Sequence, residues 1–239
     1  MKHSSFKDWI LVENDDYIII NKPPFVSTLA DRHEKIDILS EAKKYISTAQ
    51  VGHRLDKETS GVLAIAKNED AYRELAIQFE KREVHKLYHA LVEGNHRFEN
   101  TKVDLPITAL NKGTVRIDGS GKPAESYFTS IQGFNRYTLV LCQPITGRMH
   151  QLRIHLATLG APIAGDTSYG GKPIFLSSIK RNFNLKKNTE EQPLMKRVAL
   201  HAFSLRFKLR DGKDLFVEAP YPKDFEALLH QLEKNTKKS

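Results

Sequence analysis

The apolar residues of this chain fall in short runs that end at turn-forming residues, and this pattern limits the folds open to it. Asp16–Asn21 (DYIIIN) is closed by Lys22–Pro23–Pro24, and Val62–Ala66 (VLAIA) forms a second run. Runs of this length that are rich in β-branched and apolar residues predict buried strands. No window approaches the ~20 apolar residues of a membrane-spanning helix. A soluble, cytoplasmic protein is therefore expected.

Helical patterns alternate with these strands. Asn68 is a good N-cap for a helix over 69–82, in which Leu75, Ala76 and Phe79 form one apolar face. Further helices are predicted at 36–48, 149–159 and 223–234, and further strands at 51–55, 84–93, 124–132, 137–143, 199–209 and 214–218. This order predicts an α+β fold, with a single domain of two lobes around a mixed, largely antiparallel sheet with flanking helices.

The domain is expected to span residues 1–233, because no repeat, linker or sharp change of composition divides the chain. Residues 234–239 form a basic tail that is expected to be disordered. Segments 160–171 and 180–196 have no clear periodicity and are expected to be surface insertions.

Charge indicates a polyanionic partner. Lysine and arginine total 37 against 29 acidic residues, a formal net charge of +8, which favours phosphate contacts. A merely soluble basic protein fits the charge equally well. The single cysteine, Cys142, excludes an internal disulfide and Cys-rich zinc patterns, and its place in an apolar run predicts a buried structural thiol.

Nucleotide and metal sites have no support in the sequence. There is no G-x-x-x-x-G-K-[ST] motif, and Gly119–Ser120–Gly121 lacks the third glycine of a dinucleotide fingerprint. His85 and His89 are four residues apart in a predicted strand, which separates them too far to share a metal. We therefore expect neither a metal nor a nucleotide cofactor.

The segment Val51–Val62 (VGHRLDKETSGV) concentrates charged residues between two apolar runs. A strand over 51–55 would deliver Asp56 to a turn in which Thr59–Ser60–Gly61 supply capping hydroxyls and a permissive backbone. Taken alone, this segment fits a turn-capping aspartate better than a catalytic one. A glycosidase-like pair of Asp56 with Glu58 or Asp166 is a further alternative, although the sequence does not give the distance that it requires.

A second polar segment, Pro144–His155 (PITGRMHQLRIH), combines a glycine turn with Arg148, Gln151 and Arg153 near a predicted helix start. Their donors could bind phosphates or pair with a buried carboxylate. A solvated basic face is the alternative, but it explains poorly why so many strong hydrogen-bonding side chains gather at one strand-to-helix junction.

Together these segments resemble the RluA-type RNA pseudouridine synthases. The matching motifs are His53–Asp56, Thr59–Gly61, Lys86–Tyr88, Thr146–Arg153 and Leu200–Ala202, within a likeness that extends from Asn21 to Phe207. The resemblance implies a monomeric enzyme that converts specific uridines of structured ribosomal or transfer RNA to pseudouridine, without a metal or cofactor.

The resemblance also implies site residues. Asp56 would be the catalytic nucleophile or base, Arg153 its cation partner, and Tyr88 would stack on the target base with its phenol available to help remove the C5 proton. Substrate contacts would come from His53, Arg54, Lys86, Arg148, His150, Gln151 and Leu200, the last as an apolar wall under the base. If the strand at 51–55 continued, Arg54 would point to the side of Asp56, where it could fill the stack left by a flipped uridine or hold its phosphate.

Two other functions remain open from the residues alone. An N-glycosylase or glycosidase would use Asp56 to cleave rather than rejoin, and a binding or ribosome-assembly factor would lack activity. Residues 1–15 are expected to be too few for the separate RNA-binding domain often found N-terminal in this family. Substrate choice is then expected to depend on the basic surface of the catalytic domain itself.

Overall fold

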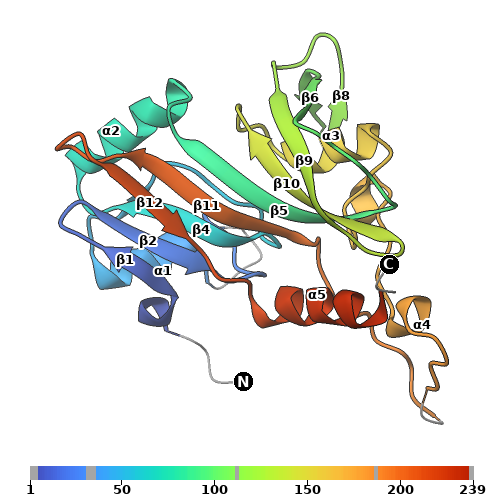
Figure 1. Cartoon of the computed structure of the whole chain (residues 1–239). Helices are drawn as coiled ribbons and strands as arrows, with labels where there is room; N and C mark the ends of the chain where they lie inside the picture. Colours follow the sequence, from blue (N-terminus) through green and yellow to red (C-terminus); the bar gives the residue numbers. More distant parts are fainter. Residues whose placement is uncertain (1–4, 31–35, 111–112, 186–187, 237–239) are drawn as a thin grey trace. The chain divides into compact units, whose positions relative to one another are not determined.

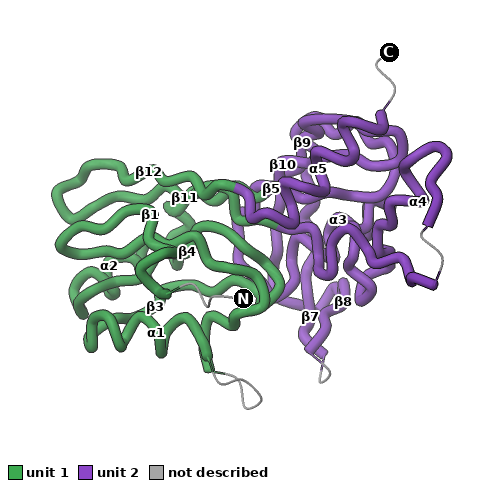
Figure 2. Tube along the Cα trace, turned by 90° about the horizontal axis from the view of Figure 1, so that it is seen from below, with its two compact units in different colours: residues 1–88, 201–220 green, residues 89–200, 221–239 purple. Residues whose placement is uncertain are grey.

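The computed structural model describes residues 5–30, 36–110, 113–185 and 188–236 (Figure 1). The chain divides into two compact units (Figure 2). Unit 1 comprises Met1–Tyr88 and His201–Pro220, and unit 2 comprises His89–Leu200 and Tyr221–Ser239. Every helix in the described residues is too short or too polar to cross a membrane.

Ten strands form a mixed sheet. They are β1 (Ile10–Glu13), β2 (Tyr17–Lys22), β3 (Gln50–Val51), β4 (Ser60–Ala66), β5 (His85–Glu93), β6 (Thr101–Asp104), β9 (Glu125–Gly133), β10 (Tyr137–Pro144), β11 (Leu200–Lys208) and β12 (Asp214–Glu218). The order is β1-β2-β4-β11-β5-β10-β9-β6, with β12 paired to β11 and β3 to β4. Strand β4 pairs with β11 in parallel, whereas β1/β2, β2/β4, β9/β10 and β11/β12 are antiparallel. The predicted α+β fold with a mixed sheet is confirmed.

Unit 1 buries its strands on both faces. Ile18 and Ile20 pack in one cluster with Ile38 of α1 (Ile38–Tyr45) and Phe6 of the short helix η1 (Phe6–Trp9). The alternate residues of β2 and β4 pack in a second cluster with Leu75 of α2 (Glu69–Glu80). Every residue of β4 is buried, which explains why its sequence is continuously apolar rather than alternating.

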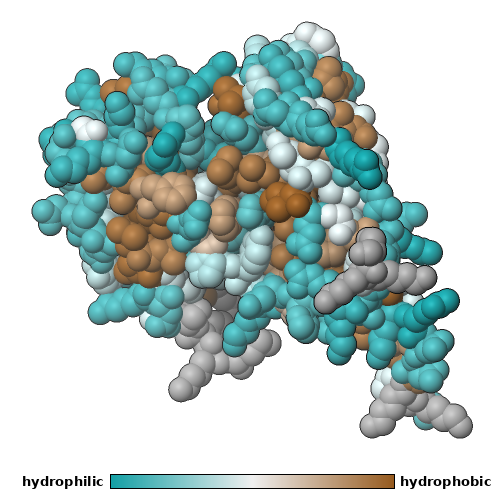
Figure 3. All heavy atoms as spheres, in the orientation of Figure 1, coloured by the Kyte–Doolittle hydropathy of each residue, from teal (hydrophilic) through white to brown (hydrophobic). Residues whose placement is uncertain are grey.

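The outer surface of unit 1 also carries apolar side chains. In the space-filling view, hydrophobic residues gather over β1, β2 and β12 (Figure 3). Phe216 of β12 is 55% exposed, while Ile10, Leu11 and Val12 of β1 are only partly buried. Exposed apolar residues are common on soluble proteins, and Phe216 therefore carries no functional argument by itself.

Unit 2 is built on the last part of β5, from His89 onward, with β9, β10 and α3 (Gln151–Thr158), which contacts β9 and β10. It also contains η2 (Thr167–Tyr169), α4 (Leu176–Ile179), α5 (Lys223–Asn235) and a separate antiparallel pair, β7 (Ile107–Ala109) with β8 (Val115–Ile117). Cys142 of β10 is fully buried, and burial raises the pKa of its thiol. The predicted structural role of this cysteine as a buried thiol is confirmed.

The other predicted strands and helices are present, with ends shifted by a few residues, except for the strand over 51–55. Strand β3 ends at Val51, because the His53 side chain replaces the main chain as the partner of β4: its Nε2 accepts the Ala64 amide at 3.0 Å. The predicted strand over 51–55 is therefore wrong beyond Val51, and the condition under which Arg54 would point to the side of Asp56 is not met. The ring of His53 turns inward, and Arg54 lies exposed in irregular chain.

Segment 160–171 is not the surface insertion that the sequence predicted. Ile163, Ala164 and Asp166 are buried, and the Ala164 amide donates to the Leu91 carbonyl of β5. The described residues of 180–196 are irregular and largely exposed, although Met195 is buried. Of the predicted disordered tail, Lys234 and Asn235 belong to α5, while residues 237–239 lie outside the described residues.

Candidate active site

Asp56 lies in unit 1, in a turn between β3 and β4. The Asp56 carbonyl accepts the Thr59 amide at 3.0 Å, which closes the turn of residues 55–59, called here the Asp56 turn. Strand β4 then passes β11 closely. Gly61 has a φ of +114°, and a Cβ added to it would lie 2.1 Å from the Ala202 carbonyl oxygen, so only glycine fits this position.

The loop of residues 23–28, which follows β2, is hydrogen-bonded to both sides of Asp56. The Thr28 hydroxyl donates to the Leu55 carbonyl at 2.9 Å and accepts the Leu55 amide at 3.1 Å. The Phe25 amide donates to the Lys57 carbonyl at 2.9 Å. We call residues 23–28 the clamp loop, because it fixes the residues immediately before and after Asp56.

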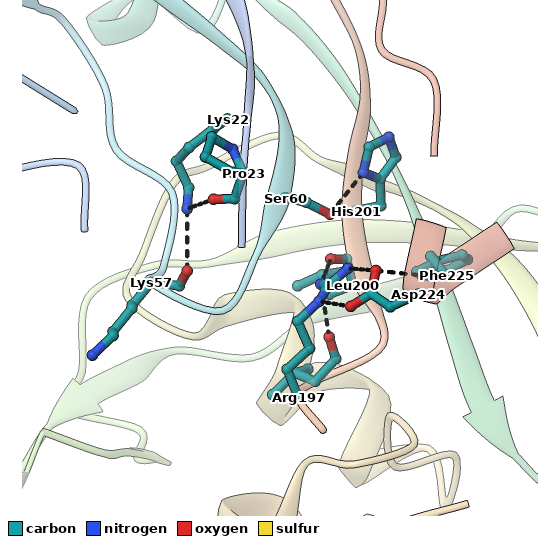
Figure 4. Close-up of polar contacts among 10 residues, drawn as sticks. Lys22, Pro23, Lys57, Ser60, Arg197, Leu200, His201, Asp224 and Phe225 are labelled. Atoms are coloured by element: carbon teal, nitrogen blue, oxygen red, sulfur yellow. Dashed lines mark hydrogen bonds and ion pairs between the residues drawn. The ribbon is translucent and has the colours of Figure 1, made fainter. Parts of the chain in front are cut away.

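Lys22 joins the clamp loop to the Asp56 turn from inside unit 1. The residue is fully buried, and its ammonium donates to the carbonyls of Val26 at 2.8 Å, Pro23 at 3.0 Å and Lys57 at 3.1 Å. Figure 4 shows the side chain pointing toward Pro23 and Lys57. An ammonium has three donors that rotate freely, which suits three converging carbonyls.

Tyr88 of β5 lies close enough to Asp56 for the carboxylate charge to act on its phenol. The side chain packs against the cluster that contains Leu55 and Ala202. Burial raises the pKa of the Tyr88 phenol, and the negative charge of Asp56 raises it further. Unit 1 thus brings Asp56 and Tyr88 together. The phenol remains neutral at physiological pH, which favours stacking and hydrogen bonding over action as a free base.

His53 and Lys86 flank the Phe79 ring in unit 1. The His53 ring stacks on Phe79 with centroids 4.6 Å apart, and the Lys86 Nζ lies 5.8 Å from the Phe79 centroid. Burial and then the Lys86 charge lower the pKa of His53 to about 3. Burial and then the charge of Arg82 lower the pKa of Lys86 to about 8. At pH 7 His53 is therefore neutral, and Lys86 is mostly charged.

His201 connects β11 to the start of β4. Its Nε2 lies 3.1 Å from the Ala219 carbonyl, and its Nδ1 lies 2.9 Å from the Ser60 hydroxyl (Figure 4). Because a carbonyl can only accept, Nε2 carries the hydrogen and Nδ1 accepts from Ser60 in the neutral ring. The buried histidine thereby orients the residue that precedes Gly61.

Arg153 of α3 forms a bidentate ion pair within unit 2. Its Nε and Nη2 donate to the two carboxylate oxygens of Asp166, both at 2.7 Å. The side chains are 10% and 1% exposed respectively. Gly165, which precedes the aspartate, has a φ of +79°, and a Cβ there would lie 2.4 Å from the Arg197 carbonyl oxygen. The glycine therefore allows the close approach that presents Asp166 to Arg153.

Tyr169 completes the surroundings of Arg153. The guanidinium carbon lies 5.0 Å from the centroid of the Tyr169 ring. The Tyr169 hydroxyl oxygen accepts the Val115 amide at 2.9 Å and lies 2.9 Å from Nδ1 of His150. His150 has a left-handed backbone, φ +51°, immediately before α3. The carboxylate and the ring together restrict the guanidinium to one orientation.

Gln151 braces the turn that precedes α3. Its Oε1 accepts the Thr146 hydroxyl at 2.6 Å and the Arg148 amide at 3.0 Å. Its Nε2 donates to the Glu125 carbonyl at 2.8 Å and to the Ser126 hydroxyl at 2.9 Å. These bonds favour a structural role for the buried amide, and contact with substrate stays a prediction. Arg148 Nε donates to the Pro123 carbonyl at 3.0 Å.

A second buried arginine of unit 2 supports Leu200. Arg197 Nε and Nη2 donate to the Asp224 carboxylate at 2.7 and 3.0 Å, and Nη1 donates to the Val198 and Leu200 carbonyls at 3.3 Å (Figure 4). Leu200 itself is 4% exposed. The only signal for Arg197 or Asp224 in the sequence is a basic residue directly before an apolar strand.

The predicted site residues divide between the two units. His53, Arg54, Asp56, Lys86 and Tyr88 belong to unit 1, and Arg148, His150, Gln151, Arg153 and Leu200 belong to unit 2. The ion pair of Asp56 with Arg153 therefore stays a prediction. Lys22 and Thr28 were missed, and Asp166 was considered only as a second catalytic carboxylate. The sequence signal for Lys22 is its position directly after an apolar strand and immediately before a pair of prolines.

Among the described residues, no three His, Cys, Asp or Glu side chains are grouped so as to hold a metal ion. The buried carboxylate of Asp166 has both oxygens engaged by Arg153. This neutralised state argues against the glycosidase alternative, in which Asp166 would serve as a second catalytic carboxylate.

Comparison with known proteins identifies the class. A family model described as RNA pseudouridylate synthase matches residues 16–158. The chain is 32% identical over 239 residues to ribosomal large subunit pseudouridine synthase C of Escherichia coli (strain K12), covering 97% of this chain and 72% of that protein. It is 33% identical over 210 residues to the Vibrio vulnificus (strain CMCP6) protein of the same name, covering 86% of this chain and 63% of that one.

The fold gives the same result. The structure of human RNA pseudouridylate synthase domain containing 4 superposes with a TM-score of 0.71 at 25% identity, covering 95% of this chain and 94% of that one. Sequence and fold together define an RNA-modifying enzyme. The chain belongs to the RNA pseudouridylate synthase family, as its motifs predicted, and the predicted enzyme class, an isomerase, is confirmed.

Proposed function

We propose that this protein converts one or a few uridines of large-subunit ribosomal RNA to pseudouridine. The relatives named ribosomal large subunit pseudouridine synthase C favour ribosomal over transfer RNA. The formal charge of +8 suits a polyanionic substrate. The observation that carries the proposal is that the charge of Asp56 acts on the Tyr88 phenol, within unit 1, which supports a carboxylate near an aromatic ring able to stack on a base.

In this proposal Asp56 acts as nucleophile or base on a uridine flipped out of the RNA. Extruding a nucleotide costs a few kcal/mol, which contacts with the protein must offset. Tyr88 stacks on the target base in its neutral form, and Leu200 supplies an apolar wall. Arg54, exposed and next to Leu55, fills the vacated stack or holds a phosphate.

Arg153 supplies the positive charge that keeps Asp56 ionised, and its bond to Asp166 keeps the guanidinium oriented. His53, Lys86, Arg148, His150 and Gln151 complete the proposed substrate contacts. The two units act as one catalytic domain over residues 1–233, in a monomeric cytoplasmic enzyme that needs neither metal nor nucleotide cofactor.

The test is carbodiimide mapping of pseudouridine in total RNA from cells with and without the gene. We expect specific ribosomal sites to disappear on deletion, to return with the wild-type gene, and to stay absent with Asp56→Asn. Full restoration by Asp56→Asn would contradict the role of this residue. Release of free uracil in vitro would indicate a glycosylase, and binding without change of the RNA would indicate an assembly factor.

Tyr88→Phe separates stacking from a contribution of the hydroxyl. Because the ring is retained, we expect unchanged RNA affinity and turnover about tenfold slower, the effect of losing roughly one hydrogen bond. Tritium release from C5-labelled uridine measures turnover. Equal turnover would confine Tyr88 to stacking, whereas a loss as complete as that of Tyr88→Ala would assign the hydroxyl to the chemistry.

A further inference from the structure

Phe25, in the clamp loop, has a backbone conformation that suits glycine but carries a large and half-exposed aromatic side chain. Its φ is +66°, in the left-handed region, where the Cβ of a bulky residue crowds the backbone. Glycine would adopt this conformation without strain. The aromatic side chain is nevertheless 49% exposed, so only part of it gains from burial. Packing thus gives a weak reason for an aromatic residue at a position suited to glycine.

The backbone of Phe25 is fixed beside the Asp56 turn. Its amide donates to the Lys57 carbonyl at 2.9 Å, and the same carbonyl accepts from the ammonium of Lys22 at 3.1 Å. Lys22 also holds the carbonyl of Val26, the next residue along the loop, at 2.8 Å. The ring is therefore displayed from a rigid part of unit 1, one hydrogen bond away from the residue that follows Asp56.

An exposed aromatic ring on a fixed backbone, in a basic protein that acts on RNA, matches the requirements of a base-stacking contact. Every base presents a π-face, so such a contact binds unpaired nucleotides with little regard to sequence. Rigid placement lowers the entropy cost of ordering the ring upon binding.

We propose that Phe25 stacks on an unpaired base that flanks the target uridine in the RNA substrate. This inference depends on the proposed function for the identity of the ligand. Phe25 is a binding residue in this proposal and takes no part in the chemical step. It holds the RNA strand next to the Asp56 turn, so its loss affects KM and Kd and leaves kcat nearly unchanged.

The experiment compares Phe25→Ala, Phe25→Gly and Phe25→Trp with Phe216→Ala. Phe216 is the matched control, because it is a similarly exposed phenylalanine of unit 1, on β12. The probe is ribosomal RNA purified from cells that lack the gene. Kd is measured by filter binding, KM and kcat by tritium release, and the thermal midpoint by circular dichroism.

We expect Phe25→Ala and Phe25→Gly to raise Kd and KM about 5- to 100-fold with kcat within about twofold, the range of one lost base stack. Phe25→Trp and Phe216→Ala should bind as wild type does. Because glycine relieves the left-handed strain, Phe25→Gly should keep or raise the thermal midpoint while it loses affinity. That combination cannot arise from a purely structural ring.

Three results would overturn the proposal: Kd unchanged in Phe25→Gly, an equal loss in Phe216→Ala, or a fall of the midpoint in Phe25→Gly that accounts for the lost binding. The proposed function fails separately, if the wild-type protein binds the RNA without isomerising it. In that case the Kd values still decide the role of Phe25. A wild-type protein that does not bind the RNA contradicts both.

Discussion

Units 1 and 2 each bury a positive side chain beside predicted site residues, but they hold it in different ways. In unit 1 the Lys22 ammonium donates to the carbonyls of Pro23, Val26 and Lys57. In unit 2 the Arg153 guanidinium is paired with both oxygens of the Asp166 carboxylate. The rounded ammonium fits converging carbonyls, whereas the planar guanidinium fits a planar anion.

This difference changes what each cation contributes. In unit 2 the two bonds to the Asp166 carboxylate fix the position of the Arg153 guanidinium. In unit 1 the three bonds of the Lys22 ammonium join the clamp loop to the turn that carries Asp56. We infer that the buried pair of unit 2 serves to orient a guanidinium, while the buried ammonium of unit 1 serves to attach a loop.

The largest effect is expected from Asp166→Asn. The substitution keeps the size of the side chain but removes the carboxylate charge that pairs with the buried Arg153 guanidinium, which should lower the free energy of unfolding by about 3–5 kcal/mol. Urea denaturation at constant m-value measures this loss. We also expect turnover to fall, because the guanidinium is no longer held in one orientation.

Asp104→Asn is the control for this prediction. Asp104 pairs with Lys102 in the same unit at 3.2 Å, but the side chains are 56% and 47% exposed respectively, so the substitution should change stability by less than about 1 kcal/mol. If both variants lost the same small amount, the Arg153–Asp166 pair would be no more than a surface ion pair, and the contrast between the units would disappear.

A smaller effect is expected from Lys22→Met. The apolar side chain leaves the carbonyls of Pro23, Val26 and Lys57 without this donor, at a cost of about 2 kcal/mol. Lys22→Arg should lower the stability by at least as much, because the planar guanidinium cannot donate to three converging carbonyls in this space. Lys44→Met, at a lysine that is 71% exposed, provides the control. Wild-type stability and turnover in Lys22→Arg would show that any cation serves here.

The sequence predicted those elements that depend on a local pattern. Val62–Ala66 is apolar throughout, and the structure buries it on both faces of the sheet. Asn68 was predicted as an N-cap, and its side chain accepts the Ala71 amide. The prediction of a strand over 51–55 was wrong, because the His53 ring accepts the hydrogen bond of the Ala64 amide in place of the main chain. A contact with a separate strand cannot be predicted from the local sequence pattern.

The candidate site was predictable to a similar degree. Asp56 and Tyr88 were named through a family resemblance, and the structure brings them close together. The pairing of Arg153 with Asp166 was not predicted from the sequence. It depends on the burial of part of segment 160–171, which the sequence predicted to be a surface insertion. The role of Lys22 depends on main-chain carbonyls of two separate segments. The sequence does not show where such carbonyls meet in the fold.

The smallest effect concerns Lys86 of unit 1, whose pKa is lowered by burial and then by the charge of Arg82. With a pKa of about 8, Lys86 is mostly charged at pH 7 and mostly neutral at pH 9. If it contacts a phosphate of the RNA, the salt dependence of binding, d log Kobs/d log[salt], should become shallower by about 0.7–0.9 between these pH values. Arginine side chains keep their charge over this range.

Lys86→Arg is the matched variant, because it keeps a positive charge at pH 9 and should show the same slope at both pH values. Unfolding caused by Lys86 cannot account for the shallower salt dependence of RNA binding that is expected of the wild type at pH 9. Since the folded state lowers the pKa of Lys86 from 10.5, the unfolded chain binds more protons between about pH 8 and 10.5, and this group makes the fold more stable as pH rises through that window. A wild-type slope that does not change with pH, or that changes equally in Lys86→Arg, would exclude a phosphate contact at Lys86.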